Sequence, residues 1–114
     1  RFPRRARHLT PAQFDAVYPT RQRVVDACFS VNAARNTLGY PRLGLSIGTK
    51  AAGDSVQRNR VKRQVRETFR NEAATLPALD LVVGARNGVR TAHNARLRES
   101  LAALFTEIRK RCEP

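Results

Sequence analysis

Apolar residues recur at helical spacing in three parts of this chain. In the middle, Val61, Val65 and Phe69 stand four positions apart, so a helix places them in one stripe. This helix is predicted to begin at residue 54 or 55, where Asp or Ser can cap it, and to end before Pro77. A short helix is predicted over residues 10–19. A terminal helix beginning at residue 91 or 94 has a buried stripe of Leu97, Leu101, Leu104, Phe105 and Ile108.

Two segments alternate between apolar and small or polar residues, as strands do. Residues 27–34 place Phe29 and Val31 on the same face. Residues 42–48 alternate more cleanly, with large apolar side chains on one face. The other face of this strand has only Gly44, Ser46 and Gly48. That bare face is either exposed to solvent or open to a ligand or another backbone, and the sequence leaves both possibilities.

Residues 79–85 form a continuous apolar run, which is typical of a strand buried on both faces. Together with the preceding strand and the long helix, this run predicts a β-α-β unit. Connectors or loops are predicted at residues 21–26, 36–41 and 49–53. A chain of 114 residues is enough for one domain and too few for two. Residues 1–114 are therefore predicted to form a single domain with a basic arm at residues 1–9.

The net charge of the chain indicates what kind of partner it binds. The chain has 22 Lys and Arg against 9 Asp and Glu, a formal net charge of +13, and 19 of these cations are Arg. A small domain with this excess repels itself unless a polyanion neutralises it. The planar guanidinium group suits phosphates and bases. Nucleic acid is therefore the expected partner, and a membrane surface is less favoured because no apolar run approaches the ~20 residues of a spanning helix.

The central helix concentrates this charge beside its apolar stripe. At about 100° per residue, Asn59, Arg63, Arg66 and Arg70 fall on one flank. An ordinary solvated helix would mix charge signs, whereas residues 58–70 contain a single acid. The one-sided distribution favours a helix that faces nucleic acid.

Candidate catalytic residues are scarce. The nine acids are scattered singly, with no pair placed for general acid and base work. His8 and His93 are interpreted as surface or phosphate-contacting residues, and Cys28 and Cys112 match no metal spacing and are expected to be reduced. We therefore predict no catalytic residue and no metal ligand in this chain. If it takes part in catalysis, another molecule supplies the reactive groups.

The predicted first helix places two aromatic rings on one face. Phe14 and Tyr18 stand at positions i and i+4. They either pack in the core or form a platform for unstacked bases, and the residues alone leave both interpretations open.

Several motifs together resemble the bacterial ribonuclease P protein subunit. The string RNRVKRQVRETFR at residues 58–70 is similar to the signature helix of that family. PRLGLSI at residues 41–47 resembles the preceding strand, and Thr49-Lys50 stands where the family usually has a lysine pair. The resemblance extends to the first helix, to LVVGAR at residues 81–86 and to the leucine-spaced terminal helix.

The resemblance implies an α+β fold in the order α-β-β-β-α-β-α. One mixed four-stranded sheet would contain a β-α-β crossover that is left-handed in this family, against the usual rule. This is the ribosomal protein S5 domain 2-like architecture. Nothing in the sequence itself indicates the handedness.

The resemblance also implies the function and the partners. The protein would join the catalytic RNA of ribonuclease P in the cytoplasm and assist the endonucleolytic removal of the 5′ leader from precursor tRNA. Mg²⁺ would be bound chiefly by the RNA, and neither a membrane nor a small-molecule substrate is expected. The alternative is a non-catalytic RNA-binding module such as a ribosomal protein or an RNA chaperone.

Residue roles follow from the same resemblance. The signature helix would bind the catalytic RNA through Arg58, Asn59, Arg60, Lys62, Arg63, Arg66 and Arg70. The cleft between the first helix and the sheet would hold the single-stranded leader through Phe14, Tyr18, Phe29, Val31, Ser46 and Lys50.

Overall fold

The structure, a computed structural model, describes residues 22–112. The chain order is β1 (Gln22–Val25), β2 (Phe29–Arg35), β3 (Arg42–Ser46), α2 (Thr49–Ala52), α3 (Ser55–Glu72), η3 (Ala73–Thr75), β4 (Leu79–Ala85), η4 (Asn87–Arg90) and α4 (Asn94–Arg111), where η marks a 3-10 turn. The predicted arm and the predicted helix at residues 10–19 lie outside the described residues.

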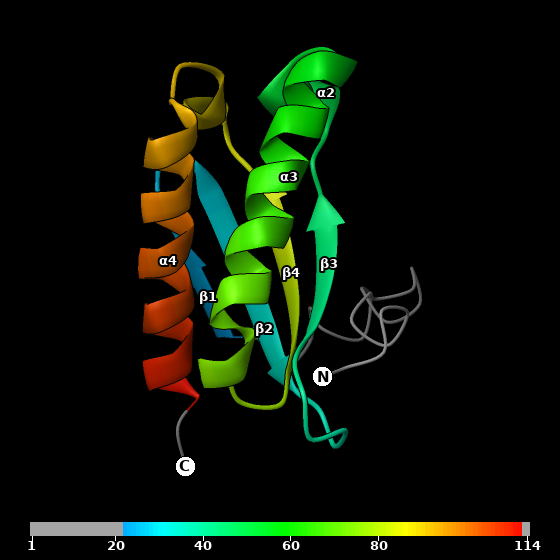
Figure 1. Ribbon diagram of the computed structural model, residues 1–114, viewed down its shortest axis with the longest axis vertical. Coiled ribbons are helices and arrows are strands. Elements are labelled where there is room, and N and C mark those ends of the chain that lie inside the picture. Colours follow the sequence, from blue (N-terminus) through cyan, green and yellow to red (C-terminus); the bar gives the residue numbers. More distant parts are fainter. Residues whose placement is uncertain (1–21, 113–114) are drawn as a thin grey trace.

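The strands form one mixed four-stranded sheet in the order β1-β2-β4-β3. β2 pairs antiparallel with β1 and β4, whereas β3 pairs parallel with β4 through α3. With the helices toward the viewer, β4 lies to the left of β3 and both strands run upward (Figure 1). The crossover is therefore left-handed, as the family resemblance implied and contrary to the general preference.

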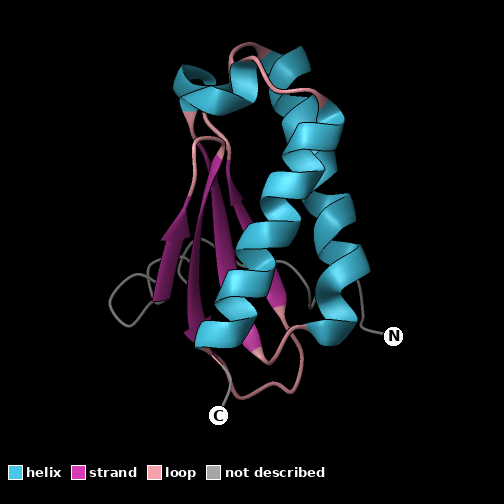
Figure 2. Cartoon of the chain, turned by 90° about the vertical axis from the view of Figure 1, so that its left-hand side faces the viewer, coloured by secondary structure: helices cyan, strands magenta, loops and turns pink. Residues whose placement is uncertain are grey.

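Both long helices cover the same face of the sheet (Figure 2). The core lies between these two layers, where Val31, Leu81 and Val83 of the sheet are fully buried. Phe69 of α3 meets Phe105 of α4 edge to face, with ring centroids 6.4 Å apart and planes at 71°. Aromatic pairs favour this geometry because the ring edge is positive and the face negative. The predicted apolar stripes of both helices therefore lie in the core, packed against the sheet.

Two predicted connectors prove to be secondary structure. Gln22–Val25 is an edge strand, although only Val24 in it is buried. Thr49–Ala52 is a single helical turn that ends at Gly53, whose φ of 100° suits glycine. The predictions of a connector at residues 21–26 and a loop at 49–53 were wrong because segments this short show no periodicity.

The start of α3 follows its sequence signal. Asp54 precedes the helix in an extended conformation and accepts a hydrogen bond from the Gln57 amide at 3.0 Å. This satisfies one of the free N–H groups of the first turn. The cap fixes the point where the cationic helix begins.

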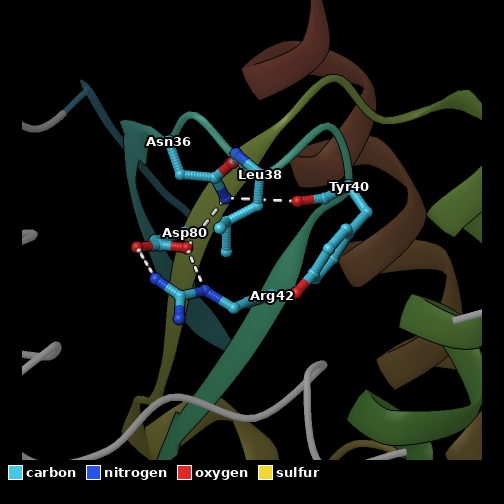
Figure 3. A network of polar contacts seen from close by, with 5 residues as sticks. All are labelled: Asn36, Leu38, Tyr40, Arg42 and Asp80. Carbon is cyan, nitrogen blue, oxygen red and sulfur yellow. Dashed lines mark hydrogen bonds and ion pairs between the residues drawn. The ribbon is translucent and has the colours of Figure 1, made fainter. Parts of the chain in front are cut away.

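A polar network fixes the loop between β2 and β3 (Figure 3). The Asn36 amide donates to Tyr40 O at 3.2 Å and to Asp80 Oδ1 at 2.9 Å, while its oxygen accepts from Leu38 N. Arg42 donates to both Asp80 oxygens, at 2.8 and 2.7 Å. These hydrogen bonds raise the pKa of Arg42. The network anchors the point where β3 begins.

The Asp26 carboxylate joins the β1–β2 turn to α4 through hydrogen bonds. One carboxylate oxygen accepts from the amides of Cys28 and Phe29 at 2.8 and 2.9 Å, and the other accepts from the Ser100 hydroxyl. Burial alone would raise the pKa of Asp26. The hydrogen bonds from Ser100, Phe29 and Cys28 and the charge of Arg96 outweigh burial, so the pKa is lowered overall.

Replacing Asp26 with Ala is expected to lower the free energy of unfolding by about 2 kcal/mol at pH 7, because charge-assisted hydrogen bonds are lost. The folded-state pKa lies below the unfolded one, so this stabilisation is present above the unfolded pKa and is lost as pH falls through the folded pKa. Urea unfolding at pH 7 and at acid pH measures the free energy of unfolding of the wild type and of the variant. The difference between wild type and variant should shrink in acid, and a constant difference would contradict the assignment. Glu99→Ala, at an exposed position of α4, is the control.

Candidate nucleic-acid interface

The exposed side of α3 is cationic. Val61 and Val65 are fully buried and Phe69 nearly so, which fixes the orientation of the helix. The residues exposed on the opposite side include Asn59, Arg63, Arg66 and Arg70. We call these four residues the α3 face. Neither of the two ion pairs found in residues 22–112 involves α3. The four side chains of the α3 face are therefore exposed to solvent, as the helical spacing predicted.

Arg58 and Lys62 lie one turn apart and are half-buried. The Nε atom of Arg58 is buried without a hydrogen-bond partner. A buried N–H group without an acceptor is costly, so an acceptor brought by a partner would stabilise this arrangement. Both side chains border the α3 face without lying at its centre.

Arg60 has a different role from the one predicted. Its guanidinium donates to Gln57 Oε1 at 3.0 Å, Ala92 O at 3.1 Å, Asn94 Oδ1 at 2.9 Å and Val89 O at 3.0 Å. Four of its five N–H donors are used inside the protein. The prediction that Arg60 binds the RNA is therefore corrected, because its guanidinium group joins α3 to η4 and to the start of α4.

The predicted leader-binding strand residues separate onto the two faces of the sheet. Phe29 and Val31 are 0% exposed and point into the core beneath the helices. The prediction that they contact the leader is therefore corrected. Ser46 is exposed, in the row that pairs Gly84 with Ser30 and Ser46. Phe14 and Tyr18 lie outside the described residues.

A shallow hollow lies where β3 and β4 end. It encloses about 470 Å³ and is lined by Ala27, Lys50, Ala51, Ala85, Arg86 and Asn87. Lys50 is exposed on α2, and Arg86 donates to Asp26 O at 3.1 Å. The sequence prediction missed Arg86 and Asn87, whose only signal was their place directly after the buried strand. The hollow combines two cations and an amide, a donor set suited to a phosphate.

Acidic and metal-ligating residues are dispersed over the described chain. Within residues 22–112, no three His, Cys, Asp or Glu side chains gather as a metal would require. No helix in this part of the chain has the length and apolar character needed to cross a membrane.

A basic α+β domain with exposed arginines along one face of a helix is typical of proteins that bind nucleic acid. The family model Ribonuclease P matches residues 2–109, so the chain belongs to the ribonuclease P protein family. The ribonuclease P protein component of Idiomarina loihiensis is 41% identical over 111 residues, covering 96% of this chain and 89% of that protein. The corresponding component of Salmonella arizonae is 41% identical over 104 residues, covering 91% and 87%.

Solved structures agree with the family assignment. The RNase P protein of Staphylococcus aureus has a TM-score of 0.83 and 27% identity, covering 89% of this chain and 94% of its own. The protein from Thermotoga maritima has a TM-score of 0.78 and 28% identity, covering 94% and 98%. The chain is thus a protein subunit of ribonuclease P, an endoribonuclease holoenzyme whose RNA subunit is catalytic. The alternative of a ribosomal protein or chaperone is not favoured.

Proposed function

We propose that the protein binds the catalytic RNA through the α3 face and the 5′ leader of precursor tRNA along the end of β3 and α2. The observation that carries this proposal is the α3 face itself. Its arginines project from a helix anchored in the core, and no acid of the described chain forms an ion pair with them. Guanidinium groups held this way neutralise phosphates and release counterions. They would also reduce the repulsion between the RNA and its substrate.

The leader contact would use Ser46, Lys50, Arg86 and Asn87. Ser46 and Lys50 are exposed, and Lys50 shares the hollow with Arg86 and Asn87. Contacts to the sugar-phosphate backbone do not depend on base identity, which suits leaders of varied sequence. Phe14 and Tyr18 are retained from the family resemblance as stacking platforms.

Mg²⁺ would be held chiefly by the RNA. This ion prefers oxygen ligands in octahedral geometry and is commonly shared with phosphates. The α3 face offers guanidinium groups, which repel cations. The protein would therefore lower the Mg²⁺ requirement by supplying positive charge beside the metal sites of the RNA. A subunit with this task is expected in the cytoplasm with its RNA.

If Lys50 contacts the leader, removing its charge should lower the affinity for precursor tRNA only. Lys50→Ala in the reconstituted holoenzyme should weaken precursor binding about tenfold, the effect of one lost charge-assisted contact, and should spare mature tRNA. Equilibrium binding of the two ligands measures this. Lys110→Ala removes the same charge from an exposed position on α4 and should change neither affinity. Equal losses for precursor and mature tRNA would rule out the leader assignment.

A further inference from the structure

The helical turn that carries Lys50 cannot be stable by itself. α2 has only four residues, Thr49–Ala52, whereas isolated helices shorter than ~12 residues are marginal in water. Within the turn, Ala52 N donates to Gly48 O and Gly53 N donates to Thr49 O. The carbonyl groups of the last turn of a helix have no donor inside the helix. The position of Lys50 therefore depends on what satisfies these carbonyls.

Arg90, from a distant part of the chain, donates hydrogen bonds to the carbonyl groups of α2, including Thr49 O, which also accepts from Gly53 N. Its Nη2 donates to Lys50 O at 2.7 Å and to Thr49 O at 3.3 Å, and its Nε donates to Ala51 O at 3.0 Å. The guanidinium thus contacts three successive carbonyls. A cation at this end of a helix also interacts favourably with the helix dipole.

The segment that carries Arg90 is itself firmly held. In η4, Gly88 N donates to Ala27 O at 3.0 Å, and Val89 is fully buried. Arg60 of α3 donates to Val89 O at 3.0 Å. Contacts therefore run from α3 through η4 and Arg90 to α2. Arg90 therefore reaches α2 from a segment that is hydrogen-bonded to the β1–β2 turn and to α3.

We propose that Arg90 is a positioning residue for Lys50. It holds α2 so that the Lys50 ammonium group faces the hollow where a leader phosphate would lie. Arg90 does not line that hollow, whereas Lys50 does. The inference rests on the proposed leader contact of Lys50. Without Arg90, α2 frays, and ordering Lys50 then costs conformational entropy when the RNA binds.

A double-mutant cycle in the reconstituted holoenzyme separates positioning from direct contact. The variants are Lys50→Ala, Arg90→Ala and the double variant, with precursor and mature tRNA affinities measured at several salt concentrations. Arg90→Ala should weaken precursor binding about fivefold and spare mature tRNA. In the Lys50→Ala background, Arg90→Ala should change neither affinity nor salt dependence, because its effect passes through Lys50.

Two further variants control for charge and folding. Arg90→Lys keeps a cation that can donate to the carbonyls and should restore part of the lost affinity. Lys110→Ala removes one charge at the far end of α4 and should have no effect. Thermal unfolding of each variant confirms that the fold is intact, and Arg90→Gln replaces Arg90→Ala if that variant unfolds.

The outcomes distinguish the two proposals. If Lys50→Ala weakens precursor binding and Arg90→Ala does not, the positioning role is wrong and the leader contact stands. If the two losses add, Arg90 contacts the RNA itself and the positioning role is again wrong. If Lys50→Ala changes nothing, the proposed leader contact fails, and the inference fails with it.

Discussion

Replacing Arg63 and Arg66 together with alanine is expected to weaken binding of the ribonuclease P RNA about 10- to 100-fold at physiological salt, because two charge-assisted phosphate contacts are lost. Both side chains are exposed on the α3 face. The salt dependence of the affinity should flatten by about one unit of slope per lost contact. Titration of the RNA at several salt concentrations measures both effects.

A matched double variant tests whether position or net charge matters. Arg23→Ala with Lys110→Ala also removes two exposed cations, but from β1 and α4. This control should lose little affinity, whereas equal losses in the two double variants would show that total charge, not the α3 face, determines binding. Stability should change by less than about 0.5 kcal/mol per substitution in either variant, because all four residues are on the surface.

Gly88→Ala is expected to destabilise the fold by about 3 kcal/mol, the upper range of overpacking. A Cβ atom at Gly88 would lie 2.3 Å from the Ala27 carbonyl oxygen and 2.8 Å from its carbon. Both are backbone atoms, so the β1–β2 turn or η4 must move. Because η4 carries Arg90, precursor binding should weaken together with stability.

Gly48→Ala is the matched control for this substitution. A Cβ atom there has no heavy atom within 4 Å, and the Gly48 φ of -90° is accessible to any residue. Urea unfolding of both variants measures the difference. If Gly88→Ala is as stable as Gly48→Ala, the close docking of η4 on the β1–β2 turn is wrong.

The parts of the fold that bury many residues were predictable from sequence. The apolar run at residues 79–85 coincides with β4, and the leucine spacing located α4. The stripe of α3 correctly indicated that Arg63, Arg66 and Arg70 are exposed. The spacing of apolar residues predicts these elements correctly because each of them buries several residues against the same layer of the fold.

The direction of a side chain was harder to predict. Alternation correctly grouped Phe29 with Val31, but it could not show which face the helices cover. The family resemblance assigned both to the leader, whereas they are buried in the core beneath the helices. The role of Arg60 was missed because its partners Val89 and Ala92 lie about 30 positions away in the chain. Contacts of this kind are fixed by tertiary packing and leave no local pattern.

The hollow was missed for the same reason. Lys50 was recognised, but Arg86 and Asn87 join it only because β3 and β4 are parallel and end together. Adjacent parallel strands have their carboxyl ends at the same edge of the sheet, so Arg86 and Asn87 lie near α2 although they are far from it in the chain.

Cleavage of precursor tRNA at low Mg²⁺ tests the central claim most directly. The catalytic RNA is assayed alone, with the wild-type protein, and with the Arg63→Ala and Arg66→Ala double variant. If the protein supports the RNA active site with positive charge, the wild-type protein will promote cleavage at the 5′ junction. The variant will need more Mg²⁺ for the same rate. Equal cleavage rates at low Mg²⁺ with and without the wild-type protein would contradict the claim.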